Sequence, residues 1–166
     1  MKNELWKTFA AQAVSHSVAH YLTAMADLRA DLGYARVSDV ARQLRVTKGS
    51  VSIQVKHLKE KGYVTEDRNR FLQLTPLGQT VVDEVRQNRE ALMQFLAKVL
   101  GVRPARAEED ACKVEHLLSP ETGRQFTALM EFLQSGDPEA RRFVRKFKKF
   151  QSASKRAGRA RKSRAR

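Results

Sequence analysis

Residues 34–64 combine helix-start signals with short apolar repeats, and this combination restricts the fold more than any other part of the sequence. Ser38 and Thr47 are residue types that cap helix N-termini, and a glycine such as Gly62 commonly ends a helix. The apolar residues after the caps recur at helical spacing: Val40, Ala41 and Leu44 in the first segment, and Val51, Val55 and Leu58 in the second. Two short helices joined by residues 45–47 predict a helix-turn-helix.

The segment that follows predicts a β-hairpin. In YVTEDRNRFLQLTP, residues 63–76, apolar and polar residues alternate on both sides of the turn at residues 68–70. A hairpin directly after a helix-turn-helix makes a winged helix, which we expect over roughly residues 11–75. We assign residues 1–75 to this domain.

The rest of the sequence predicts a mostly α-helical protein. Apolar residues recur at helical spacing between proline or glycine breaks, which predicts helices over residues about 4–32, 76–100, 104–118 and 119–134. The last of these should bury a stripe made of Phe126, Leu129, Met130 and Leu133. We expect a helical domain over residues 76–136, and a basic amphipathic helix with a polybasic tail over residues 137–166. Residues 151–166 contain too little apolar surface to fold alone.

The net charge of +14 indicates an anionic partner. Thirteen of the 32 Lys and Arg residues, but only two of the 18 acidic residues, lie from Asp137 onwards, so the C-terminal end carries most of the excess. We expect double-stranded DNA as the partner and rank a membrane surface second. Residues 8–26 lack charges but contain too many polar side chains for a membrane span. A single cysteine favours a reducing, cytoplasmic location.

The second helix of the helix-turn-helix presents side chains suited to DNA on the face opposite its apolar residues. Small hydroxyls approach phosphates, amides read base edges and lysines neutralise backbone charge. Arginines at the hairpin tip would reach the adjacent minor groove or phosphates. The predicted DNA-binding residues are Thr47, Lys48, Ser50, Ser52, Ile53, Gln54, Lys56, His57, Arg68 and Arg70. An ordinary solvated helix face is the alternative, but the capped helix before it and the hairpin after it favour DNA.

A possible metal site lies in the stretch ACKVEHLLSP, residues 111–120. Cys112, Glu115 and His116 are spaced i, i+3 and i+4, so one helical face would carry a thiol, a carboxylate and an imidazole. Several divalent transition ions accept this mixture of donors. The same spacing also fits a small buried cysteine beside a surface carboxylate and a hydrogen-bonded histidine, so spacing alone leaves both interpretations open.

The strings YARVSDVARQLRV, GSVS, LQLTPLG and EDACKVEHLLSPET resemble the DtxR/MntR family of metal-dependent transcriptional repressors, over about residues 20–132. The resemblance implies a winged-helix domain, a helical dimerisation domain and a homodimer that binds an operator with Fe²⁺ or Mn²⁺ as corepressor. It also implies one ligand from the first helix and three from the Cys-x-x-Glu-His run. The implied ligands are His20, Cys112, Glu115 and His116.

This ligand set departs from the family pattern. An imidazole at His20 and a thiolate are softer donors than a manganese-type site uses, which favours Fe²⁺, with Zn²⁺, Co²⁺ or Ni²⁺ possible in vitro. His16, one turn before His20, is a further but less favoured donor. The second metal position of the family falls on Arg89, Met93 and Glu108. Because arginine has no lone pair to donate, we expect one metal ion for each chain.

Two functional interpretations remain from the sequence. The first is a metal-dependent repressor of metal homeostasis genes, in which metal occupancy fixes the dimer for operator binding. The alternative is a metal-independent winged-helix DNA-binding protein with a vestigial metal site, which Arg89 and the basic tail favour. An enzyme built on Cys112 and His116 is not expected, because no pocket signature or oxyanion hole accompanies them.

Overall fold

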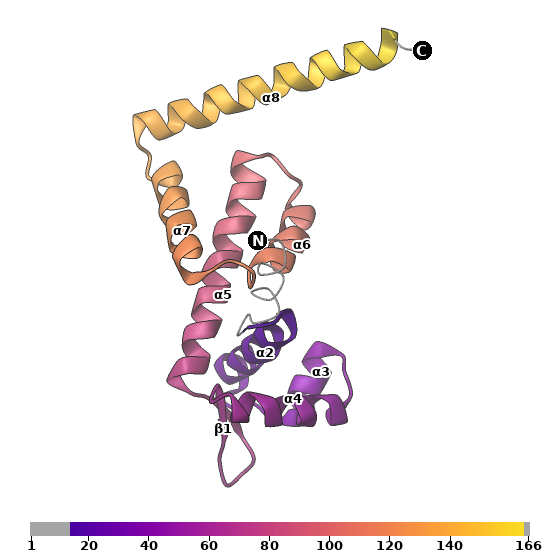
Figure 1. Cartoon of the computed structure of the whole chain (residues 1–166), viewed down its shortest axis with the longest axis vertical. Coiled ribbons are helices and arrows are strands. Elements are labelled where there is room, and N and C mark those ends of the chain that lie inside the picture. The colour runs from indigo at the N-terminus through magenta and orange to yellow at the C-terminus, as the bar shows by residue number, and fades with distance from the viewer. Residues whose placement is uncertain (1–13, 165–166) are drawn as a thin grey trace, which may run out of the picture. The chain divides into compact units, whose positions relative to one another are not determined.

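The computed structural model of the chain describes residues 14–164, with side chains described through residue 154. Its helices and strands fall into two compact units, each with its own apolar core. Of the described residues, unit 1 contains those up to Arg86 together with Glu115–Leu117, and unit 2 contains Gln87–Val114 and those from Leu118 onwards. Figure 1 shows the elements in chain order.

Unit 1 is a winged helix-turn-helix, as the sequence predicts. Its elements are α2 (His16–Leu32), α3 (Val37–Leu44), α4 (Lys48–Glu60), β1 (Val64–Glu66), β2 (Leu72–Leu74) and the first part of α5 (Pro76–Gln94). Residues 45–47 join α3 to α4, and Arg45 adopts a left-handed backbone (φ 55°) that turns the chain between them.

Two predicted helix boundaries in unit 1 are confirmed by hydrogen bonds. The Thr47 Oγ1 accepts a hydrogen bond from the Ser50 N–H (3.1 Å) and caps α4. Gly33 ends α2 in the left-handed region (φ 79°), where its N–H donates to the Arg29 carbonyl (3.0 Å).

The helix expected over residues 4–32 begins at His16 in the described part of the chain. Ser15 has an extended backbone, and its hydroxyl accepts a hydrogen bond from the Val18 N–H (3.3 Å), so it forms a cap. Residues 4–13 of the expected helix lie outside the described residues.

The predicted cap at Ser38 is wrong, because α3 already begins at Val37. The Ala35 carbonyl accepts a hydrogen bond from the Leu72 N–H (2.8 Å), which ties this backbone to the wing. Arg36 is then extended and leads directly into the helix without a side-chain cap. A contact from 37 residues away therefore overrides the local capping preference of Ser38.

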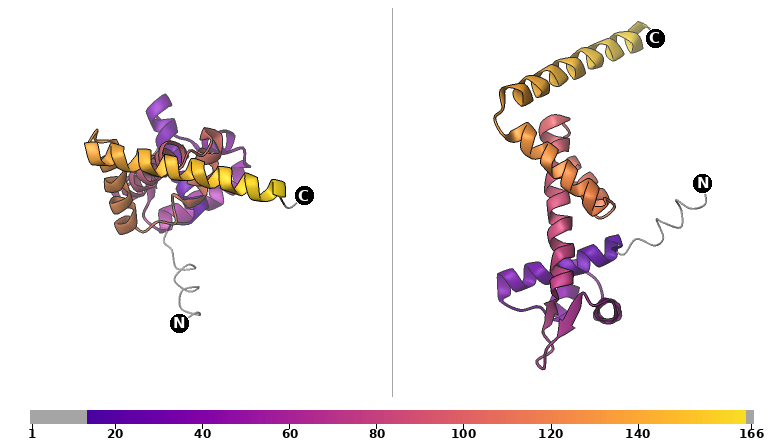
Figure 2. Two further views of the ribbon diagram at one scale, coloured as in Figure 1. Left: turned by 90° about the horizontal axis from the view of Figure 1, so that it is seen from above. Right: turned by 60° about the vertical axis from the view of Figure 1, so that its left-hand side comes forward.

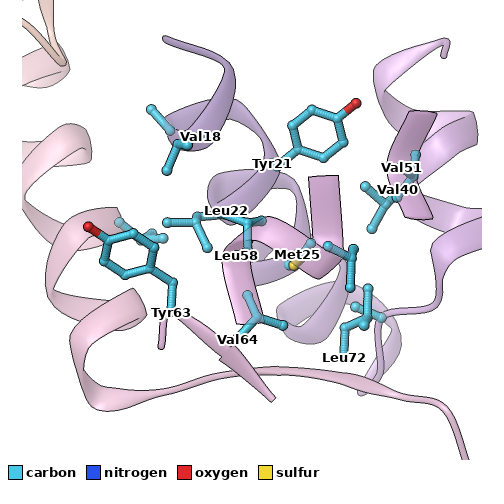
Figure 3. Packing of buried hydrophobic residues seen from close by; sticks show 14 of the residues in the cluster. Val18, Tyr21, Leu22, Met25, Val40, Val51, Leu58, Tyr63, Val64 and Leu72 are labelled. Carbon is cyan, nitrogen blue, oxygen red and sulfur yellow. The ribbon is translucent and has the colours of Figure 1, made fainter. Parts of the chain in front are cut away.

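The core of unit 1 lies where α2, α3, α4 and the hairpin meet, and Figure 3 shows it from close by. The predicted apolar face of α4 is buried, with Val51 and Leu58 fully enclosed. Replacing a fully buried leucine by alanine usually costs about 2–5 kcal/mol, so this packing fixes the orientation of α4. The core residues labelled in Figure 3 are Val18, Tyr21, Leu22, Met25, Val40, Val51, Leu58, Tyr63, Val64 and Leu72.

The wing is a two-stranded antiparallel sheet in which Val64 lies opposite Leu74. Its tip is held by Asp67, whose Oδ1 accepts hydrogen bonds from the N–H groups of Asn69 and Phe71 (2.9 Å each). An aspartate that bonds to the backbone two residues ahead makes a turn without needing glycine. The predicted turn is therefore stabilised by a side chain within the hairpin itself.

Unit 2 contains the second part of α5, the π-helical segment η1 (Phe95–Val99), α6 (Pro104–Val114), α7 (Pro120–Gln134) and α8 (Pro138–Arg164). Its core is smaller than that of unit 1. Three residues are buried in it, Ala91, Val99 and Met130, and five partly buried residues pack against them, namely Phe95, Leu100, Phe126, Leu133 and Phe147. Gly123 permits close packing of α7 on α5, because an added Cβ would lie 2.2 Å from the Asn88 Oδ1.

The predicted helix over residues 104–118 ends early, at Val114. Ser119 is an N-cap with an extended backbone (ψ 154°), and its Oγ accepts from the Thr122 N–H (3.2 Å). Because Pro120 disfavours a helical residue before it, the chain leaves the helix ahead of Ser119. Residues 115–117 form a turn, so the Cys-x-x-Glu-His run begins in a helix and ends outside it.

Two further expectations for unit 2 are corrected. Leu129 of the expected buried stripe is 45% exposed, although Met130 beside it is buried. The polybasic tail is not separate from the amphipathic helix, because α8 continues to Arg164 as one unbroken helix, which Figure 2 shows. Alanine, lysine and arginine have high helix propensity, so a helix that has begun at Pro138 can extend past residue 151 without needing apolar surface to bury there. Among the helices of residues 14–164, none combines the length and hydropathy that a membrane span requires.

Candidate metal centre and nucleic-acid interface

Helix α4 presents its predicted DNA-reading residues to solvent. Because Val51, Val55 and Leu58 face the core, the opposite side of the helix is exposed, and Ile53 is 64% exposed there. A branched apolar side chain in water contributes little to folding, but it is well suited to contact a thymine methyl group in the major groove. Gln54 on the same helix is half-buried, so its amide has less freedom than its neighbours.

Both serines on α4 make local hydrogen bonds. The Ser50 Oγ lies 3.5 Å from the Tyr21 hydroxyl of α2, and the Ser52 Oγ donates to the Lys48 carbonyl (2.9 Å). Hydroxyl groups retain further donor or acceptor capacity after one bond. The Tyr21–Ser50 contact links α4 to α2.

A groove of about 620 Å³ lies between α4, the start of α3 and the wing. Among the described residues that line it, five are basic and one is acidic, and this acid, Glu66, pairs with Lys59. The basic residues that line it are Arg36, Lys48, Lys56, Lys59 and Arg70. This concentration of positive charge suits a phosphate backbone.

Arg36 is a groove residue that sequence reasoning missed. Its guanidinium carbon lies 4.7 Å from the centre of the Phe71 ring and 5.3 Å from that of Tyr34, and the two rings are 5.2 Å apart. Stacking on aromatic rings holds a guanidinium in place while it stays charged. The hydrogen bond between the Ala35 carbonyl and the wing brings these side chains together, so the local sequence around Arg36 does not predict the stacking.

The wing arginines are both exposed, as a DNA-contacting role requires. Arg70 has a left-handed backbone (φ 60°), and its N–H donates to the Asp67 carbonyl (3.0 Å). Arg70 lines the basic groove, and it also lines a second hollow of the wing together with Arg68.

Three of the four histidines in the chain lie close together within unit 1. His16 and His20 lie one turn apart at the start of α2, with ring centroids 4.3 Å apart and ligand nitrogens within 4.8 Å of one another. The His116 ring lies 4.8 Å from that of His16. The structure thus brings two predicted ligands, His20 and His116, close to His16, which the sequence favours less as a metal donor.

His116 is suited to donate a lone pair. Its Nδ1 is buried, and no hydrogen-bond partner for this atom is found among residues 14–154. Burial is the main cause that lowers the pKa of His116, and the neighbouring charges of His16 and His20 lower it further. The ring therefore favours its neutral form, which is the form that binds a metal. Beside it, Glu115 is 2% exposed.

Cys112 lies on α6, in unit 2, and is half-buried. Glu115 is only three positions further along the chain, so the chain alone keeps the Cα atoms of the two residues within about 11 Å. The residues at the expected second metal position are also in unit 2. Arg89 and Met93 are half-buried on α5, and Glu108 is exposed on α6.

Two family models match the chain and together cover most of it. One describes the N-terminal DNA-binding domain of an iron-dependent repressor and matches residues 14–71. The other describes the metal-binding and dimerisation domain of an iron-dependent repressor and matches residues 75–145. The resemblance found in the sequence is thus confirmed.

Individual relatives agree with the family models. The regulator MntR of Lysinibacillus sphaericus is 41% identical over 92 residues, which cover 55% of this chain and 66% of the relative. MntR of Bacillus pumilus is 32% identical over 121 residues, covering 73% of this chain and 83% of the relative. Among solved structures, IdeR of T. acidophilum superposes with a TM-score of 0.53 at 27% identity, covering 65% of this chain and 51% of that one.

The chain therefore spans about two thirds of the first relative and about half of the IdeR chain. The matches nevertheless include both domains of the repressor, and the DNA-binding match covers the winged helix from α2 through β1 to the tip of the wing. The chain belongs to the DtxR/MntR family of metal-dependent transcriptional regulators, which is a family of DNA-binding proteins and not of enzymes.

Proposed function

We propose that this protein is a homodimeric repressor that binds operator DNA when each chain holds one divalent transition ion. The proposed ligands are His20, Cys112, Glu115 and His116. The observation that carries the proposal is the gathering of three histidines in the unit that also contains the helix-turn-helix.

The described residues fit such an ion. Imidazole nitrogens, a carboxylate and a thiol are ligands that Fe²⁺, Co²⁺, Ni²⁺ and Zn²⁺ all accept. The Nδ1 of His116 is buried, and the described side chains supply no hydrogen-bond partner for it. Buried polar atoms normally have a partner, and a metal ion would supply one here. When bound, the ion supplies a positive centre toward which these donors converge. We favour Fe²⁺ over Mn²⁺, because manganese prefers oxygen donors.

Helix α2 couples the ligands to the reading surface. His20 is followed directly by Tyr21, whose ring is buried against α4 and whose hydroxyl lies 3.5 Å from the Ser50 Oγ. Restricting His20 therefore restricts the orientation of α4. In a dimer, two such helices must lie about 34 Å apart to read successive major grooves. Ligand binding at His20 would thus increase the population of dimers with the correct spacing.

Unit 2 supports the homodimer. Large apolar side chains are exposed there, and such side chains are normally covered in an assembly. They are Leu129, Phe132, Phe143 and Phe150. The match of residues 75–145 to a dimerisation domain agrees with this role.

Metal-stripped protein provides the test of the proposed function. Binding sequences would be selected from random DNA duplexes under anaerobic conditions, in separate samples with chelator, Fe²⁺ or Mn²⁺. We expect an inverted repeat to be enriched only when metal is present, and Cys112→Ala to weaken that enrichment. Enrichment of the same repeat in chelator would instead support the second candidate, a metal-independent DNA-binding protein.

The stoichiometry of one ion rests on Arg89, which stands at the expected second position. A guanidinium is always protonated and places a fixed positive charge there. Arg89→His should raise the number of bound metal ions from one to two per chain, as measured by elemental analysis after dialysis. Two ions in both proteins would contradict this part of the proposal.

The C-terminal part of α8 is proposed to bind DNA phosphates without sequence preference. From Pro138 to Arg164 the helix carries 12 basic residues and one acid, a charge distribution complementary to DNA. Basic contacts of this kind act through counterion release. Deleting residues 151–166 should therefore make DNA affinity less dependent on salt, and an unchanged salt dependence would exclude the role.

A further inference from the structure

We propose that His16 is an additional ligand in this metal site, which makes the site rich in imidazole and selective for Fe²⁺, Co²⁺, Ni²⁺ or Zn²⁺ over Mn²⁺. The inference rests on the proposed function and extends its ligand set. The four ligands implied by the family resemblance do not include this position.

The geometry within unit 1 supports His16 as a ligand. His16 and His20 are at i and i+4 on one helical face, a spacing at which two histidines bind one metal ion in other proteins. Their rings meet edge to face at 64°, with ligand nitrogens within 4.8 Å. The centroid of the His116 ring is 4.8 Å from that of His16, so His16 lies close to two proposed ligands at once.

The backbone at His16 is well fixed. It is the first residue of α2, and Ser15 caps the helix through its hydroxyl and through its carbonyl, which accepts from the Ala19 N–H (3.0 Å). A fixed backbone keeps the separation of His16 from His20 near the helical value, and only side-chain rotation remains. A ligand position needs this kind of preorganisation.

Folding gives no reason for a histidine at this place. His16 is exposed, so it buries little surface. The first turn of a helix favours acidic residues because of the helix dipole, and α2 has none there. A histidine at the start of α2, one turn before His20 and close to His116, is more readily explained by ligand binding than by the stability of the helix.

The extra imidazole has a consequence for metal choice. Nitrogen donors strengthen binding of the ions later in the Irving–Williams order more than binding of Mn²⁺. Loss of an outer-shell partner alone costs about 10- to 100-fold in metal affinity, so loss of a direct ligand should cost at least about tenfold. We therefore expect His16→Ala to weaken Co²⁺ and Zn²⁺ binding by at least about tenfold and Mn²⁺ binding much less.

The experiment uses metal-stripped, full-length protein titrated anaerobically with Co²⁺, Zn²⁺ and Mn²⁺. Wild type is compared with His16→Ala and with Ser17→Ala, an exposed residue on the same turn that serves as the control. Visible absorption of Co²⁺ reports both the d–d bands of the site and the charge-transfer band from a thiolate ligand. We expect His16→Ala to shift the d–d bands and lose affinity while the thiolate band remains, and Ser17→Ala to match wild type.

Identical Co²⁺ affinity and spectra in wild type and His16→Ala would overturn the inference and leave the four-ligand site intact. Failure of wild-type protein to bind any of the ions would overturn both this inference and the proposed function. A second readout avoids dependence on the variant: X-ray absorption of zinc-loaded wild type should require three imidazole ligands, and a fit with two would contradict the inference.

Discussion

A substitution at Gly78 on α5 would test how closely α5 packs against the backbone that leads into the wing, because there is no room for a side chain at this position. A Cβ added there would lie 2.1 Å from the Tyr63 carbonyl oxygen and 3.0 Å from its carbonyl carbon. The same oxygen accepts a hydrogen bond from the Thr75 N–H (3.0 Å), and Tyr63 itself is buried. The clash therefore falls on backbone that joins α4 to the wing, which cannot rotate away as a side chain would.

The size of the effect of Gly78→Ala follows from two opposing terms. Overpacking costs roughly 1–3 kcal/mol, and a contact this short with backbone belongs at the upper end. Alanine in a helix gains about 1 kcal/mol over glycine. The net loss should be about 2 kcal/mol, which for a chain of this length lowers the melting temperature by roughly 4–8 °C.

Gly49→Ala on α4 is the matched control, because its added Cβ would meet only the Thr47 Oγ1 at 3.9 Å. This substitution should leave stability unchanged or raise it by up to about 1 kcal/mol. Urea and thermal unfolding of the three proteins, followed by circular dichroism, gives the comparison. A Gly78→Ala protein that melts at or above the wild-type temperature would refute the close approach of α5 to the wing.

Three further predictions concern the winged helix. Arg36→Ala should weaken binding to all DNA sequences to a similar degree and reduce the salt slope by about one, because it removes a phosphate contact; a loss confined to the operator would argue against this role. Gln54→Ala should relax base preference at one operator position at a cost of about 1–3 kcal/mol, which affinity measurements on single-base operator variants would detect. Leu58→Ala, at a fully buried position, should lower the free energy of unfolding by about 2–5 kcal/mol, and a loss below 1 kcal/mol would contradict the observed core.

Helix ends could be predicted from the sequence where only neighbouring residues determine them. Thr47 caps its helix as predicted, and Ser119 caps the helix expected from residue 119, because each cap needs only the backbone three residues ahead. Gly33 ends α2 for a similar reason, since a left-handed residue is cheapest at glycine. Ser38 failed as a cap because the Leu72 N–H, which is distant in sequence, sets the path of the chain before α3.

In the candidate sites too, some features follow from local sequence and others depend on contacts between distant parts of the chain. The exposed face of α4 could be predicted, because the positions of three buried residues determine which side of a helix remains outside. The stacking of Arg36 on Phe71 depends on strand pairing, and periodicity does not report it. His16 was visible in the sequence, but its nearness to His116 required the tertiary structure. The continuation of α8 was missed because a helix with high intrinsic propensity does not need the burial on which the prediction relied.

The central claim is that the metal ligands control operator binding, and the most direct test is operator affinity with and without metal. Fluorescence anisotropy would give Kd for one labelled operator at fixed ionic strength, for wild type and His20→Ala, in excess chelator and in excess Fe²⁺. We predict tighter binding by wild type in Fe²⁺, within the roughly 5- to 150-fold range of allosteric coupling, and no such gain for His20→Ala. Equal wild-type affinities in Fe²⁺ and in chelator would contradict this claim.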